Sequence, residues 1–113
     1  MPPEDKVRIQ HMIDAGEEAL RFAQGRQRSD LDKDRMLVLA LIKDVEIIGE
    51  AASKVTEKVK EAHPEIPWLS IIGMRNRLIH AYFDINLDVL WRTIQEDLPP
   101  LIKHLTHILG SIS

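Results

Sequence analysis

The chain has 113 residues, with 15 lysines and arginines against 18 aspartates and glutamates, so its formal net charge is −3. This length suits one domain with one core, which we expect to span residues 1–113. The acidic balance argues against a general nucleic-acid coat, because such proteins bind mainly by neutralising phosphates. It remains compatible with a small, local basic site.

Cysteine is absent, which excludes disulfides, thiolate metal sites and cysteine nucleophiles and fits a reducing cytoplasm. The apolar runs are too short to cross a bilayer, and residues 1–20 show no signal-peptide pattern. We therefore predict a cytoplasmic protein without a membrane segment.

Helical periodicity runs through nearly the whole chain, and no sustained alternation or hairpin turn predicts a strand. A first helix is expected after Pro3, ending near Gly25. Ser29 or Asp30 can cap a second helix, predicted to run from about 31 to 62. At 1.5 Å per residue this helix would be roughly 45 Å long, more than the core of such a domain needs, so part of it is expected to contact a partner.

The sequence "HPEIPW" predicts a turn, because each proline disfavours helix in the residue before it. A third helix is expected near Trp68, covering residues 70–83, and Asn86 is a good cap for a fourth. Pro99 and Pro100 are expected to kink that helix or to open a short fifth one, residues 101–109. The prediction is an all-α bundle of four to five helices with a long second helix.

The segment "GMRNRLIHAYFD" (residues 73–84) concentrates polar groups in an otherwise apolar stretch. Counted as a helix at 100° per residue, Arg75, Asn76, His80 and Tyr82 line one broad edge. Such groups are costly to bury unpaired, so the edge is expected to face a cleft or a subunit boundary. A histidine can move protons and an arginine can hold a phosphate, which together suit phosphoryl chemistry without a metal.

Acid–base cleavage of RNA needs a base for the 2′-hydroxyl and an acid for the leaving oxygen, and one His80 cannot easily supply both. A two-fold dimer across this edge would bring a second His80. The residues alone leave another interpretation open, in which Arg75 simply pairs with Glu50 or Asp84 and His80 caps a helix end.

The sequence "RNRLIHAY" (residues 75–82) resembles the Arg-x4-His-x-Tyr motif of HepT-like proteins in the HEPN superfamily. Three flanking segments resemble the same family in the same order, so that the likeness extends from about residue 30 to the C-terminus. They are "IIGEAASKV" (47–55), "IPWLSIIGMRN" (66–76) and "LWRTIQEDLPPL" (90–101).

The resemblance implies a helical-bundle homodimer that acts as a metal-independent endoribonuclease toxin, without a cofactor, and leaves a cyclic phosphate on RNA. Its partner would be a minimal nucleotidyltransferase antitoxin, MntA. By the same resemblance, Arg75 and His80 would be the catalytic pair, Asn76 a polarising or positioning residue, and Tyr82 the hydroxyl that receives AMP.

Three further points bear on the site. The small residues around Glu50 would let another helix approach, which could bring Glu50 toward Arg75 of either chain as a supporting residue. His104 and His107 are three residues apart, but two histidines without a carboxylate are weak evidence for a metal, and we interpret them as surface residues. The rival function is a non-catalytic helical dimer that binds and supports a nucleotidyltransferase.

Overall fold

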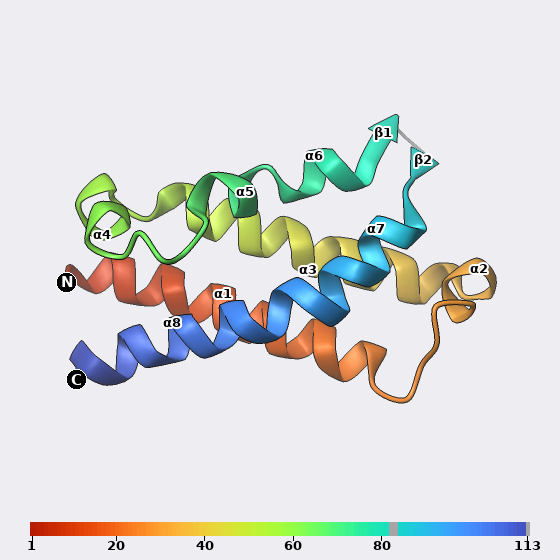
Figure 1. The fold of residues 1–113 in the computed structure, drawn as a ribbon, viewed down its shortest axis with the longest axis horizontal. Coiled ribbons are helices and arrows are strands. Elements are labelled where there is room, and N and C mark those ends of the chain that lie inside the picture. The colour runs from red at the N-terminus through yellow and green to blue at the C-terminus, as the bar shows by residue number, and fades with distance from the viewer. Residues whose placement is uncertain (82–83, 113) are drawn as a thin grey trace.

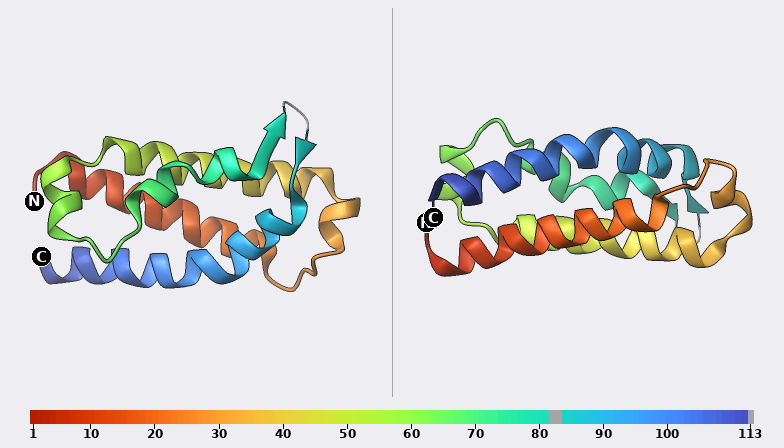
Figure 2. Two further views of the ribbon diagram at one scale, coloured as in Figure 1. Left: turned by 45° about the horizontal axis from the view of Figure 1, so that its top comes forward. Right: turned by 90° about the horizontal axis from the view of Figure 1, so that it is seen from below.

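Three long helices form the body of the computed structural model, which describes residues 1–81 and 84–112 (Figure 1). They are α1 (Pro3–Ala23), α3 (Arg35–Lys54) and α8 (Leu98–Ile112). Helix α1 packs along both α3 and α8, and the two chain termini lie at the same end of the bundle (Figure 2). Shorter elements complete the described chain: α2 (Asp30–Lys33), α4 (Glu57–Ala62), α5 (Trp68–Ile72), α6 (Met74–Leu78), β1 (Ile79–Ala81), β2 (Asp84–Ile85), α7 (Leu87–Arg92) and the π-helix η1 (Thr93–Asp97).

The core lies where the apolar stripes of these helices meet. Met12 on α1, Leu41 on α3 and Leu105 on α8 are fully buried. Burying one such side chain is worth about 1.5–3 kcal/mol, and many of them share this core. The all-α prediction is thereby confirmed. Among the described residues, no helix is long and apolar enough to cross a membrane.

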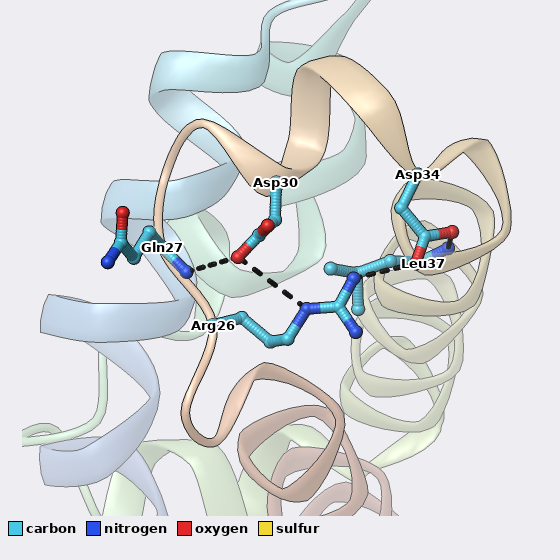
Figure 3. Close-up of polar contacts among 5 residues, drawn as sticks. All are labelled: Arg26, Gln27, Asp30, Asp34 and Leu37. Atoms are coloured by element: carbon cyan, nitrogen blue, oxygen red, sulfur yellow. Dashed lines mark hydrogen bonds and ion pairs between the residues drawn. The ribbon is translucent and has the colours of Figure 1, made fainter.

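The predicted helix over residues 31–62 is instead three helices, and the first break lies at Asp34. This residue has φ −116° and ψ 90°, and its carboxylate accepts a hydrogen bond from the Leu37 N–H at 3.1 Å. Arg26 donates to the same carboxylate at 2.6 Å and lies 3.6 Å from Asp30 (Figure 3). The bond from Arg26, with the one from Leu37, holds the pKa of Asp34 below its ordinary value. Asp34 therefore starts a new helix instead of continuing the previous one.

The second break follows Lys54 and depends on a buried acid in α1. Asp5 is 1% exposed and accepts hydrogen bonds from the Thr56 N–H at 3.0 Å and the Thr56 hydroxyl at 2.7 Å. These bonds draw the chain out of helical conformation at Val55, where ψ is 137°. With 20 residues, α3 is about 30 Å long at 1.5 Å per residue. The excess length that suggested a partner is absent.

The segment that follows α4 departs most from the prediction, because residues 70–83 are not one helix. Helix α5 ends at Ile72, α6 ends at Leu78, and β1 pairs antiparallel with β2, with Ile79 opposite Ile85. The Leu78 carbonyl accepts a hydrogen bond of 2.7 Å from the Asn86 N–H. It is thus bonded across the hairpin, which ends the helix there.

The C-terminal part is more continuous than expected. Asn86 caps α7 as predicted, accepting from the Val89 N–H at 3.1 Å. Helices α7, η1 and α8 then follow without a gap, and the predicted fifth helix is part of α8. Pro99 and Pro100 have no N–H to donate to the preceding turn, so carbonyls there lose their usual partners. The wider π-turn of η1, directly before the prolines, is the local response.

A candidate active-site groove over α3

A groove of about 560 Å³ opens over the outer face of α3. Helix α3 packs against α1 on one side and against α5 and α6 on the other. The groove is therefore bordered by α1 on one side and by α6 on the other. The side chains that line it are mainly polar and charged: Arg8, His11, Lys43, Val45, Glu46, Ile47, Gly49, Glu50, Ala51, Ser53, Lys54, Ile72, Arg75 and Asn76.

Arg75 enters the groove from α6 and is held through one nitrogen. Its Nε donates to Glu46 Oε1 at 2.9 Å, and its side chain is 52% exposed. Among the described residues its guanidinium makes no other hydrogen bond or ion pair. The two terminal nitrogens are therefore available to a ligand, and this fork geometry matches the oxygens of a phosphate.

Asn76 follows Arg75 and also lines the groove, with an exposed side chain. Arg77 points to a different face, where its Nη1 donates to the Ser70 carbonyl and the Ser70 hydroxyl, both at 2.9 Å. The prediction that Arg75 and Asn76 lie on one edge is confirmed. The assignment of His80 and Tyr82 to the same helical face is wrong, because α6 ends at Leu78.

His80 lies in β1, the strand that directly follows the helix carrying Arg75. The motif therefore spans a helix and a strand, and its spacing cannot be interpreted as one helical face. The side chain of His80 and the whole of Tyr82 lie outside the described residues.

Glu46 is a residue of this site that the sequence patterns did not predict. Pairing of Arg75 with Glu50 or Asp84 is wrong, because the partner is Glu46, one helical turn before Glu50. Glu50 instead lies 3.3 Å from Lys54 of its own helix, where it also lines the groove. The available signal was the i, i+4 spacing of two acids on one face of α3.

The predicted close helix approach next to Glu50 is present. A Cβ added to Gly49 would lie 3.4 Å from the Ile71 carbonyl oxygen and 3.5 Å from that of Ile72. Helix α5 therefore passes close to α3 at this point. That approach places α6 and Arg75 beside Glu46 in the groove.

A second acidic group lies on α3 but faces the core. Asp44 is 1% exposed, and its burial, with a smaller contribution from the nearby Glu18 carboxyl of α1, raises its pKa to about 7. Arg21 acts in the opposite direction and lowers it. Asp44 belongs to the α1–α3 contact and is not among the groove-lining residues.

His104 and His107 are exposed on α8, as expected for surface residues. Within residues 1–81 and 84–112, no group of three or more histidine, aspartate or glutamate side chains is arranged to hold a metal ion.

The fold and groove define an all-α domain with an arginine-bearing site suited to an anionic substrate. The sequence profile of the family described as "Ribonuclease HepT-like" matches residues 12–108. The chain therefore belongs to the HepT-like ribonuclease family, and the all-α fold agrees with the HEPN superfamily.

Individual relatives agree with this assignment. A protein of Caldanaerobacter subterraneus subsp. tengcongensis named "Putative RNase" is 36% identical over 101 residues, which cover 89% of this chain and 90% of the relative. The "Probable ribonuclease HepT" of Thermococcus cleftensis is 47% identical over 68 residues, covering 60% of this chain and 62% of the relative. A "Putative RNase" of Methanocaldococcus jannaschii is 30% identical over 100 residues, covering 88% and 92%. No solved structure matches the chain significantly.

Proposed function

We propose that this protein is a metal-independent endoribonuclease whose active site contains Arg75, Asn76 and His80. The observation that carries the proposal is the state of Arg75, which projects into a groove with its Nε bonded to Glu46 and its terminal nitrogens available. A guanidinium oriented in this way can receive a phosphodiester without first breaking its own support. Family membership supports the nuclease class.

In the proposed reaction, the imidazole of His80 accepts the proton of the RNA 2′-hydroxyl. The 2′-oxygen then attacks the neighbouring phosphorus, and the bond from phosphorus to the 5′-oxygen breaks to leave a cyclic phosphate. Arg75 stabilises the negative charge that develops on the non-bridging oxygens, and Asn76 positions the phosphate. The departing 5′-oxygen takes its proton from a second acid.

We propose that this acid is the partner's His80, in a homodimer. Exposed apolar side chains on the outer faces of α1 and α3 support such an assembly: Met36 is 81% exposed, Leu39 48% and Phe22 40%. Met36 shares its stripe on α3 with the groove residues Lys43 and Ile47, at spacings of seven and eleven residues. Exposed apolar surface of this kind is typical of protein contacts.

The wider proposal is a toxin that pairs with a minimal nucleotidyltransferase antitoxin of the MntA type, which would transfer AMP to Tyr82. The adduct would add a negative phosphate to the motif that contains Arg75 and would compete with RNA for the guanidinium. A Tyr82→Phe variant should cleave RNA normally and remain active after incubation with the nucleotidyltransferase and ATP.

The direct test is incubation of the purified protein with RNA in EDTA. The wild type should produce fragments with cyclic phosphate ends and should inhibit growth when expressed. His80→Ala should keep the fold and the dimer but lose both activities, whereas His107→Ala, at an exposed histidine of α8, should behave as wild type. Intact RNA with the wild type would favour the rival, a non-catalytic dimer that supports a nucleotidyltransferase.

A further inference from the structure

The groove contains basic side chains that the proposed active site does not use. Arg8 and His11 line it from α1, one helical turn apart, and Lys43 lines it from α3. Arg75 reaches the same groove from α6, on the other side of α3. The groove therefore leads across α3 from the proposed cleavage site to a second set of basic side chains.

The charges in the groove do not cancel. Glu46 is paired with Arg75 at 2.9 Å, and Glu50 is paired with Lys54 at 3.3 Å. Within the two described stretches of the chain, Arg8 and Lys43 make no ion pair or side-chain hydrogen bond. The groove thus has an excess of positive charge, although the whole chain carries −3.

We propose that Arg8 and Lys43 bind backbone phosphates of single-stranded RNA next to the phosphate that Arg75 holds, an inference that rests on the function proposed above. Unpaired cations on α1 and α3 and a guanidinium on α6 line the same groove, so that successive phosphates of one strand can bind to them. Because phosphate contacts are electrostatic, each should make binding more sensitive to salt.

The shape of the groove favours a single strand over a duplex. Its volume of about 560 Å³ lies within the range of about 300–1,000 Å³ typical of clefts that enclose small ligands. Double-stranded RNA is recognised instead over a long outer surface, with contacts spread over about 16 base pairs in the known double-strand-binding domains. We therefore expect the groove to bind a single strand in preference to a duplex.

The lining also predicts how selective this track is. Among the described residues that line the groove there is no phenylalanine, tyrosine or tryptophan on which a base could stack. Binding at Arg8 and Lys43 should therefore depend on the RNA backbone and tolerate any base.

The test compares binding of a fluorescent, 2′-O-methylated oligoribonucleotide, which cannot be cut by 2′-hydroxyl attack, over a range of salt concentrations. Replacing Arg8 and Lys43 together by glutamine removes both charges and keeps most of each aliphatic stem. The slope of log affinity against log salt should become shallower by about 1.4, at 0.7 per phosphate contact on a single strand. The wild type should bind the single strand more tightly than the matching duplex.

The charge-matched control replaces Lys58 and Lys103, two exposed lysines outside the groove, by glutamine. An equal loss of RNA affinity in both double variants, or no loss of affinity in either, would overturn the proposal. So would unchanged RNA binding with lost binding of a nucleotidyltransferase, which would assign this face to a protein partner. Because the strand cannot be cut, binding is measured independently of whether the wild type proves to be a nuclease.

Discussion

Helix α3 and the segment from α5 to β2 lie side by side, yet they differ in how well they match the helix predicted from the sequence. Helix α3 stays helical for 20 residues and buries a regular apolar stripe. The neighbouring segment contains two helices of five residues each and a short antiparallel strand pair. Residues 31–62 and 70–83 were each expected to form one continuous helix. Each region contributes one residue to the Glu46–Arg75 pair.

This difference separates the residues that stabilise the fold from those proposed to act on RNA. The stripe of α3 provides a rigid support, and its outer face presents Glu46 to the groove. The segment from α5 to β2 gives up helical hydrogen bonds where it is interrupted. Helix α6 ends at Leu78 as a result, and His80 lies in β1. Changes on the buried stripe of α3 should therefore act mainly on stability, and changes at the groove mainly on activity.

The largest effect is expected at the two arginines of α6, which face different sides. Arg75→Ala should lower RNA cleavage about 100- to 1,000-fold, because the developing phosphate charge loses its main stabilising group. Arg77→Ala removes the same charge from a side chain bonded to Ser70 and should leave cleavage unchanged. Initial cleavage rates, with circular dichroism as the folding check, would measure both. Equal losses would contradict the assignment of the groove.

Substitutions on the buried face of α3 should instead affect the stability of the fold. Leu41 is fully buried, and Leu41→Ala should lower the free energy of unfolding by about 2–5 kcal/mol through lost burial and a cavity. Leu39 on the same helix is 48% exposed, and its replacement by alanine should stay within about 0.5 kcal/mol for the monomer. Urea denaturation measures both. A small loss at Leu41 would mean that the core can collapse around the cavity.

The buried carboxyl of Asp44 makes the α1–α3 contact sensitive to pH. Because its pKa rises from 3.8 to about 7 on folding, the folded state binds more protons than the unfolded state between these values. The free energy of unfolding should therefore fall as pH rises from about 4 to 7 and then level off, by roughly 1–3 kcal/mol in total. Asp44→Asn should flatten this dependence in urea denaturation series. An unchanged pH profile in the variant would exclude Asp44 as its source.

Glu46 connects the two regions, and its removal should reduce catalysis without unfolding the protein. Glu46→Gln weakens the bond that orients Arg75 and should lower kcat about tenfold, equal to roughly 1.4 kcal/mol, with a smaller change in KM. Glu50→Gln, in the same groove but paired with Lys54, is the matched control and should leave kcat unchanged. A faster Glu46→Gln enzyme would instead identify Glu46 as a competitor of the phosphate.

The smallest effect is expected where the broken segment rejoins a helix. Asn86→Ala removes the side-chain cap of α7 and should cost about 1 kcal/mol of unfolding free energy. Ser29→Ala, at a helix start where the side chain makes no capping bond, should cost nothing measurable. Thermal denaturation of both variants would test this. Equal shifts in melting temperature would show that the Asn86 cap has no specific stabilising effect.

Local patterns predicted much of this molecule correctly. Apolar spacing predicted an all-α fold and the first helix, and side-chain chemistry predicted the cap at Asn86. The motif placed Arg75 and Asn76 together because they are sequence neighbours. These features depend on residues within one or two turns of each other, which a sequence displays directly.

Contacts between distant residues decided the rest. Asp5 ends α3 through Thr56, 51 positions away, and Glu46 holds Arg75 from 29 positions away. The hairpin bond from Asn86 stops α6, and the groove joins α1 to α6 across α3. The amino-acid sequence by itself determined which segments favour helix and which residues carry reactive groups. Only the tertiary structure decided where those helices end and which charges meet, because hydrogen bonds and ion pairs formed across the fold outweigh local helical preference.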